Sequence, residues 1–325
     1  MARRWERNDG LSRAGESGAR PPAGAPTGLP ARAWRDALRR TPGEYKADNL
    51  SDWAAALTYY GVLAIFPALL ALVSILGLLG SASIRPLIDN LATLAPGSAR
   101  DIITDALRQL EHNRGQALSA LIIGTLAALW SASGYIAAFM RASNAVYDIG
   151  EGRPVWKTLP IRFGVTLVVL LLLAAIAVGV VFTGTLADRT GHLLGIGQSG
   201  VTAWNFAKWP VMVILFALII ALLYWAAPNV RRGFSWVTPG SLLAVLIWIV
   251  ISTLFALYVG HFASYNKTYG SLAAVIIFLV WLWLSNIAIL LGLEFNTELE
   301  RGRAIESGHP PDLEPYVEPR DTRGL

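Results

Sequence analysis

Long apolar blocks alternate with short polar segments along this chain of 325 residues. Each block approaches or exceeds the roughly 20 helical residues that cross the hydrocarbon core of a bilayer. None of the blocks contains Asp, Glu, Lys or Arg in its interior. The pattern predicts an all-α, polytopic membrane helical bundle with about six transmembrane helices, at residues 56–80, 117–140, 163–187, 209–226, 240–262 and 271–293.

A different pattern fills the segment between the first two blocks. Apolar residues fall at helical spacing around Leu87 and Leu91, and again around Ile103 and Leu107, with charged residues between them. This pattern predicts two amphipathic external helices within residues 84–112. Two placements stay open: the helices lie on the outer membrane–water boundary, or they roof a cavity between the spans.

The two ends of the chain are polar. Residues 1–45 are predicted to form a disordered and amphipathic cytoplasmic tail, because their proline- and glycine-rich first part buries too little apolar surface to fold. Within this tail Trp34, Ala37 and Leu38 share one helical face, which either rests on the inner leaflet or belongs to a solvated helix. Residues 46–300 form the predicted six-span membrane domain, and residues 301–325 form a cytoplasmic C-terminal tail.

The distribution of Lys and Arg predicts the orientation of the spans. With the N-terminus placed inside, 20 of the 27 Lys and Arg residues fall in cytoplasmic segments and 7 fall in external ones. Both ends of the chain are therefore expected in the cytoplasm. The first span, which begins near Leu57, is expected to act as an uncleaved insertion signal.

Composition supports lipid contact and limits the chemistry. Hydrophobic residues make up 54% of the chain and charged residues 15%, where soluble domains carry about 25% charged residues. The net charge of +5 is attributed to basic residues that flank membrane helices, and nucleic-acid binding is not expected. There is no cysteine, the 4 histidines lack metal-ligand spacing, and no phosphate-binding glycine loop occurs. We therefore expect no enzyme activity, no metal site and no cofactor.

Polar groups within or at the ends of the spans are where function would show, because each costs free energy unless it is hydrogen-bonded or paired. Several of them fall in residues 261–271, which are expected to form a very short external turn. Helix packing and interfacial anchoring are the competing interpretations for all of these residues. The candidate substrate or pathway residues are Tyr59, Tyr60, Pro67, Asn144, Tyr265, Lys267, Tyr269, Asn286 and Glu294.

Seven short motifs occur within residues 40–300, and together they are specific for one protein family. They are Ala54–Tyr60 with Phe66-Pro67, Leu129–Gly134, Arg141–Asp148, Pro228–Val230 with Trp236, Pro239-Gly240, Tyr269–Ala274 and Leu291–Asn296. With these motifs the chain resembles the YihY/BrkB family of bacterial inner-membrane proteins, some of which are labelled ribonuclease BN-like. The resemblance implies a virulence-factor-like, multi-pass protein of the bacterial cytoplasmic membrane, for which a transport role is a proposal. One departure is Leu293, where the family usually has a small alanine before the glutamate.

The first hypothesis for function is a transporter or flippase of lipid-like or amphipathic envelope components, because charge-free spans suit such a cargo better than a small ion. The alternative is a non-transporting envelope scaffold that binds other proteins through the external helices and the tails. A ribonuclease is the least favoured interpretation, since no acid–base pair or metal-ligand set for RNA hydrolysis is visible. Expected partners are membrane lipids and other envelope proteins, and the oligomeric state stays open.

Overall fold

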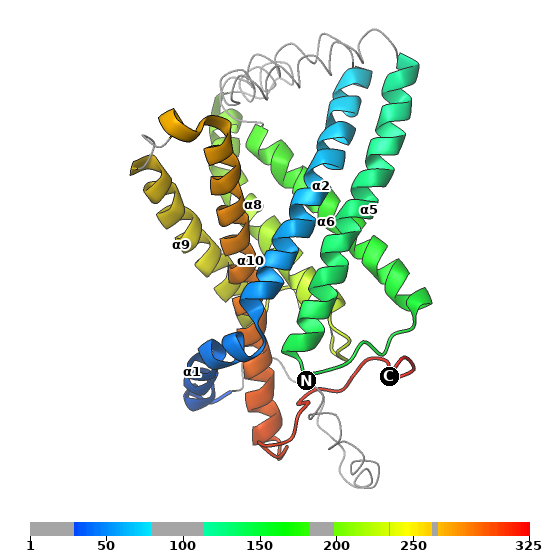
Figure 1. Ribbon diagram of the computed structural model, residues 1–325. Helices are drawn as coiled ribbons and strands as arrows, with labels where there is room; N and C mark the ends of the chain where they lie inside the picture. Colours follow the sequence, from blue (N-terminus) through cyan, green and yellow to red (C-terminus); the bar gives the residue numbers. More distant parts are fainter. Residues whose placement is uncertain (1–28, 80–113, 182–197, 234, 262–265) are drawn as a thin grey trace.

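A computed structural model of the chain describes residues 29–79, 114–181, 198–233, 235–261 and 266–325, and most of these residues are helical (Figure 1). These residues form seven helices and one isolated β-bridge, without a strand. This finding confirms the all-α fold class that the apolar pattern predicts. The helices are α1 (Ala31–Ala47), α2 (Leu50–Leu79), α5 (Arg114–Val146), α6 (Val155–Val181), α8 (Gln198–Ala226), α9 (Pro239–His261) and α10 (Asn266–Glu306).

Five of these helices are long and apolar enough to cross a membrane, as expected for a multi-pass bundle. The remaining predicted span, residues 56–80, falls within α2 up to Leu79, and α2 packs along α5 (Figure 1). The count of six spans stays a prediction, and residues 84–112 lie outside the described residues. The five candidate spans are Ile122–Val146, Val155–Ile176, Thr202–Ala226, Pro239–Val259 and Val275–Glu306.

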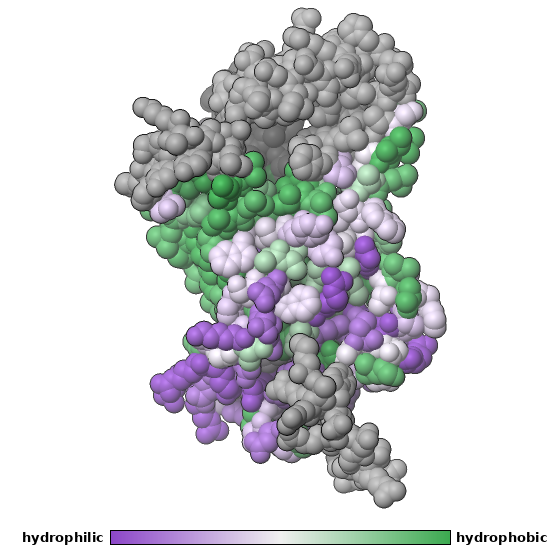
Figure 2. Space-filling model, viewed as in Figure 1, coloured by the Kyte–Doolittle hydropathy of each residue, from purple (hydrophilic) through white to green (hydrophobic). Residues whose placement is uncertain are grey.

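The surface of the bundle has an apolar zone and a polar zone. Figure 2 shows apolar side chains gathered over the middle of the visible face and polar ones at the end that holds α1 and the C-terminus. Large side chains such as Leu126, Leu171, Ile214 and Leu254 are more than 60% exposed. Exposed apolar surface of this extent is expected of helices that contact lipid.

The polar end of the bundle collects segments that are far apart in the sequence. It contains α1, the loops that follow α5 and α8, the last turns of α10, and the C-terminal segment (residues 307–325), which folds back along the bundle (Figure 1). Helix α1 packs on α10, and α9 runs along α10. The first and the last described residues therefore lie at the same end of the molecule.

The buried face of α1 contains Trp34 and Ala37, as predicted, but not Leu38. Ala33 and Ala37 are buried, and the ring of Trp34 lies 6.1 Å from the ring of Phe295 in α10. Leu38, expected to share this apolar face, is 54% exposed, so that expectation is wrong. The physical reason is that the small alanines let α1 approach α10 closely, and this contact turns Leu38 outward. The buried face of α1 rests on α10, rather than on lipid or water.

Helix α10 begins earlier than the sequence predicts. Residues 261–271 are predicted to form a short turn, but α10 begins at Asn266 and includes Lys267 and Tyr269 in its first turn. The predicted turn is therefore wrong in its second half. Backbone groups near a membrane are best satisfied within a helix, and this favours a longer α10 over an open loop.

Two glycines allow α9 and α10 to cross closely. A Cβ atom added to Gly240 would lie 2.1 Å from the carbonyl oxygen of Gly292, and one added to Gly292 would lie 2.4 Å from the carbonyl oxygen of Gly240. A side chain at either position would push the two backbones apart. Beside this crossing, the Tyr224 hydroxyl of α8 donates to the carbonyl oxygen of Ile289 in α10. The crossing therefore joins α8, α9 and α10 next to the polar end.

We expect Gly292→Ala to lower the free energy of unfolding by about 1–3 kcal/mol, because overpacking a close contact displaces backbone atoms. Thermal unfolding of the purified protein in detergent, followed by circular dichroism, would measure the change. Gly164→Ala in α6 is the matched control, because no atom lies within 4 Å of its added Cβ and alanine favours a helix. An equal loss of stability in both variants would contradict the close crossing.

Candidate functional site

The polar end is organised around the C-terminus of α8. The last carbonyl groups of a helix have no partner within the helix. Here Arg153, Arg232 and Arg320, from three segments, donate to the four consecutive carbonyl oxygens of residues 224–227. The bonds from Arg153 and Arg320 are between 2.6 and 3.2 Å long. The three guanidinium groups satisfy the acceptors and also suit the negative end of the helix dipole.

Asn144 and Glu151 hold Arg153 in place. The Glu151 carboxylate accepts two bonds of 2.7 Å from the Arg153 guanidinium, and the Arg153 side chain is only 1% exposed. Asn144 donates to Glu151 (3.0 Å) and accepts from the backbone N–H of Asn229 (2.8 Å). Burial by itself would raise the pKa of Glu151, but its bonds with Arg153 outweigh burial and hold this pKa below its ordinary value. Asn144, a predicted pathway residue, therefore links α5 to the loop that follows α5 and to the loop that follows α8.

Asn229 attaches the C-terminal segment to the bundle. Its side-chain amide donates to the carbonyl oxygen of Asp321 (2.7 Å) and accepts from the N–H of Asp321 (3.1 Å). Its own carbonyl oxygen accepts from the N–H of Arg320 (2.7 Å), and the isolated β-bridge lies next to it, between Val230 and Pro319. The last residues of the chain are therefore bound to the α8–α9 loop through backbone groups.

Asp321 adds ionic contacts to this attachment. Its carboxylate accepts from the side chain of Arg323 (2.7 Å) and from Lys157 at the start of α6 (2.8 Å). These bonds, with those of Arg323 first, hold the pKa of Asp321 well below its ordinary value. The C-terminal segment is thus tied to α6 as well as to the α8–α9 loop.

Arg232 connects the α8–α9 loop with α5 and α10. Its guanidinium donates to the Tyr147 hydroxyl (2.7 Å) and to the Glu300 carboxylate (2.8 Å), and it lies 5.5 Å from the centre of the Tyr147 ring. Burial raises the pKa of Tyr147 to about 12, so its hydroxyl stays protonated. Burial would lower the pKa of Arg232, but Tyr147 and Glu300 outweigh burial and raise it. The charged guanidinium is therefore stable at this buried position.

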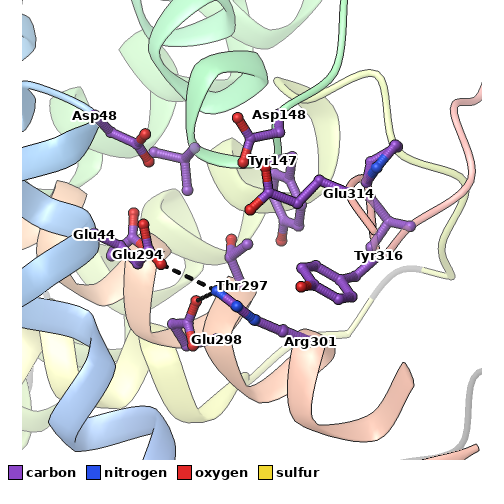
Figure 3. A pocket seen from close by; sticks show the side chains of 13 residues that line it. Glu44, Asp48, Tyr147, Asp148, Glu294, Thr297, Glu298, Arg301, Glu314 and Tyr316 are labelled. Atoms are coloured by element: carbon purple, nitrogen blue, oxygen red, sulfur yellow. Dashed lines mark hydrogen bonds and ion pairs between the residues drawn. The ribbon is translucent and has the colours of Figure 1, made fainter. Parts of the chain in front are cut away.

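A cleft of about 20 Å³ opens beside this network, between α1, α10, the end of α5 and the C-terminal segment (Figure 3). Carboxyl groups dominate its wall, since six Asp and Glu residues line it together with one arginine. Hydroxyl groups and apolar side chains complete the wall. The lining residues are Glu44, Asp48, Val146, Tyr147, Asp148, Glu294, Thr297, Glu298, Arg301, Glu314, Pro315, Tyr316 and Val317.

Two carboxylates of the cleft are held in ion pairs. Arg301 lies 3.0 Å from Glu44 and 3.4 Å from Glu298, and Figure 3 marks these contacts with dashed lines. Arg40 of α1 also pairs with Glu298. Because Glu44 and Arg40 belong to α1, these pairs help to hold α1 on α10.

Glu294 takes part in none of these ion pairs and is the most deeply buried carboxylate of the cleft. The residue is 1% exposed and lines the cleft, and its Oε2 has no hydrogen-bond partner within the described part of the chain. In Figure 3 it lies next to Glu44 at the cleft wall. A carboxylate that is buried without a cation or a donor costs several kcal/mol. Of the predicted pathway residues that the structure describes, Glu294 is the one that lines the cleft.

Asn286 lies deeper in α10, and its amide is satisfied. Its Oδ1 accepts from the Tyr135 hydroxyl (2.8 Å), and its Nδ2 donates to the Thr58 hydroxyl (3.0 Å). The residue is 2% exposed. Asn286 thus ties α10 to α2 and α5, which are contacts expected of helix packing.

The aromatic candidates of α2 lie away from the cleft. Tyr59 is 61% exposed on the outside of the helix. Tyr60 packs over Gly134 of α5, where its ring lies 2.9 Å from the position of an added Cβ. The helix continues through Pro67.

Two further candidates lie at the opposite end of α10. Lys267 and Tyr269 lie in its first turn, whereas Glu294 and the cleft lie toward its end. Tyr265 lies outside the described residues. The structure therefore does not bring the predicted pathway residues together into one site.

The sequence reasoning missed the residues that surround Glu294. Glu44 and Asp48 come from the N-terminal region, Asp148 follows α5, and Glu314 belongs to the C-terminal segment. No spacing along the chain connects them. The one local signal is Asp148, whose φ of +51° marks the end of α5 but does not say what the side chain faces.

We expect the attachment of the C-terminal segment to weaken as the pH falls below about 4. Because the pKa of Asp321 is depressed in the folded protein, its contribution is complete above the unfolded pKa of about 3.9 and is lost at lower pH. The chain has no cysteine, so a spin label at Thr322→Cys would report on this segment alone. The mobility of the label in EPR spectra should increase on acidification, and Asp321→Asn should make it mobile already near neutral pH. A label equally immobile at both pH values and in both backgrounds would contradict this expectation.

The sequence matches the profile of the family described as virulence factor BrkB over residues 41–315. It is 31% identical over 281 residues to the ribonuclease-like protein YfkH of Bacillus subtilis. The match covers 86% of this chain and 98% of that protein. A UPF0761 membrane protein of Aromatoleum aromaticum is 26% identical, and the match covers 86% of this chain and 68% of that protein. A UPF0761 membrane protein of Pseudoalteromonas translucida is 29% identical, and the match covers 80% of this chain and 86% of that protein. No solved structure matches the chain. The resemblance seen in the motifs is confirmed, and the chain belongs to the virulence factor BrkB family of membrane proteins.

Proposed function

We propose that this protein transports a lipid-like or amphipathic component of the cell envelope across the bacterial cytoplasmic membrane. The observation that carries the proposal is Glu294, a buried carboxylate with an unpartnered oxygen in a cleft at the polar end of the bundle. Ionisable groups buried in membrane helices are costly, and function is the usual reason to retain them.

The spans favour an amphipathic cargo over a small ion. The predicted apolar blocks contain no Asp, Glu, Lys or Arg, and the amide of Asn286 is already hydrogen-bonded. A hydrated ion needs charged or open polar groups along its path. An amphipathic molecule can instead keep its apolar part in lipid while its head group meets the polar end of the bundle.

The proposal assigns no catalytic activity to this chain. The name of the Bacillus subtilis relative contains the word ribonuclease-like, and that word describes that protein. Six carboxyl groups and one arginine line the cleft, so its wall does not complement the polyanionic backbone of RNA. RNA hydrolysis also needs positioned acid–base groups or metal ligands that the RNA can reach.

We expect the purified protein in liposomes to accelerate the exchange of NBD-labelled phospholipids between the two leaflets. The fraction of label that dithionite quenches would measure the exchange, with and without an imposed pH gradient. Glu294→Gln should slow the exchange about tenfold or more, because it removes the buried ionisable group. Glu306→Gln is the matched control, since Glu306 is exposed on the same helix and does not line the cleft.

Exchange no faster than in empty liposomes, for every lipid class and gradient tested, would overturn the transport proposal. Stoichiometric protein partners captured by cross-linking in native membranes, together with that result, would favour the scaffold alternative. Equal exchange by wild type and Glu294→Gln would remove Glu294 from the transport step.

We also infer that both ends of the chain, and with them the cleft, face the cytoplasm. The first and the last described residues lie at one end of the bundle (Figure 1), and its loops contain Arg153, Arg231 and Arg232. An excess of Lys and Arg in short loops marks the cytoplasmic side.

The orientation would be measured with reporters fused to Leu325. A C-terminal green fluorescent protein should be fluorescent in cells, and a C-terminal alkaline phosphatase should be inactive, because the phosphatase needs the periplasm to form its disulfides. The opposite pair of results would place this end outside.

A further inference from the structure

The cleft carries a strong excess of negative charge. Six carboxyl groups line it, and Arg301 is the single cationic side chain among the lining residues that the structure describes. Arg301 is shared between Glu44 and Glu298, and Glu298 has a second cationic partner in Arg40. Arg40 and Arg301 therefore pair with carboxylates where α1 meets α10, and neither of these pairs includes Glu294.

Glu294 provides a second observation that points to a ligand. The residue is 1% exposed, and its Oε2 has no partner within the described residues. Surface acidic residues can be satisfied by water, but a carboxylate oxygen at this depth needs a donor or a cation inside the cleft. An acceptor of this kind at the wall of an open cleft is suited to a positively charged donor from outside the chain.

The size of the cleft restricts the ligand. A volume of about 20 Å³ accommodates a group of the size of a water molecule. An ammonium group has this size, and a planar guanidinium or a hydrated divalent cation is larger. A dehydrated metal ion would need several ligands around it, and in the described ranges no group of three His, Cys, Asp or Glu side chains is arranged to hold one.

The hydroxyl groups of the cleft match the donors of an ammonium group. A primary ammonium presents three N–H donors and no acceptor. Tyr316 donates its hydroxyl hydrogen to the carbonyl oxygen of Pro311, and its oxygen keeps a lone pair for a further donor. Tyr147 and Thr297 place two more hydroxyl oxygens on the wall, and Figure 3 shows Tyr147 and Tyr316 on the side of the cleft away from Glu44. Carboxylate and hydroxyl acceptors thus line one small space together.

We propose that the acidic cleft binds a single primary ammonium group, with Glu294 as its buried carboxylate partner. The shared chemistry has two sources, a free amine such as a diamine, or the ethanolamine head group of a phospholipid. Binding itself does not depend on transport. The further step, that the ammonium belongs to the transported cargo, rests on the proposed function.

The test uses the full-length protein in detergent without added lipid, with putrescine as the probe and isothermal titration calorimetry as the measurement. We expect saturable binding of one putrescine per chain. Glu294→Gln should weaken this binding by roughly thirtyfold or more, because it removes one partner of a buried charge pair. Glu306→Gln, exposed and outside the cleft, should bind as the wild type does.

A second variant guards against a misfolded Glu294→Gln. Asp148 lines the cleft, is exposed and has a positive φ, which asparagine tolerates well, so Asp148→Asn should leave the fold intact. It should weaken putrescine binding about threefold, the size expected of an exposed charge. Thermal unfolding of both variants would show that each is folded.

The lipid source is tested in nanodiscs that contain phosphatidylethanolamine, phosphatidylcholine or phosphatidylglycerol. If the head group is the ligand, phosphatidylethanolamine should compete with putrescine, whereas phosphatidylcholine should not, because its trimethylammonium group has no N–H to donate to Glu294. If a free amine is the ligand, putrescine should bind equally in all three.

Three results would overturn the proposal: no binding of putrescine or phosphatidylethanolamine by folded wild type, equal binding by Glu294→Gln, or displacement of putrescine by equimolar potassium. The last result would assign the cleft to an inorganic cation. Lipid exchange in liposomes without amine binding would leave the transport proposal standing and remove this one, and amine binding without lipid exchange would do the reverse.

Discussion

The carbonyl oxygens at the C-terminus of α8 impose the constraint from which the polar end of this protein follows. A helix that ends against packed protein cannot leave these acceptors to water, and each unpaired one costs free energy. Arg153, Arg232 and Arg320 satisfy them from three separate segments. To do so, the loop after α5, the loop after α8 and the C-terminal segment must all converge on the end of α8, and one set of acceptors therefore holds them together.

The acidic cleft is a consequence of how the nearby arginines are used. The guanidinium of Arg232 is bound to Tyr147, Glu300 and a helix carbonyl, and Arg301 is shared between two other carboxylates. Glu294 lies near this network but receives no bond to its Oε2 from the described residues. The protein thus concentrates carboxylates in a small space while its cations are engaged elsewhere, and this arrangement favours a cation that is not part of the chain.

Much of the helical architecture could be predicted because a bilayer imposes a rule on single segments, namely enough apolar residues and a backbone that satisfies its own hydrogen bonds. Asn144 and Glu294 were identifiable as polar residues at the ends of spans. Their surroundings were not, since the partners of Asn144 come from two loops and the neighbours of Glu294 from both ends of the chain. Leu38 shows the same limit, because a periodic pattern defines a helical face but the neighbouring helix decides whether that face is buried.

The sequence by itself determined the all-helical membrane class, the family and the set of polar residues available for function. Only the tertiary structure decided which of these residues are satisfied: the amide of Asn286 is hydrogen-bonded to α2 and α5, whereas Glu294 retains an unpartnered oxygen at a cleft. The physical reason is that hydropathy and charge belong to each segment alone. A hydrogen bond or a buried charge depends instead on which segments meet, and here that depends on contacts such as the close approach of Gly240 to Gly292.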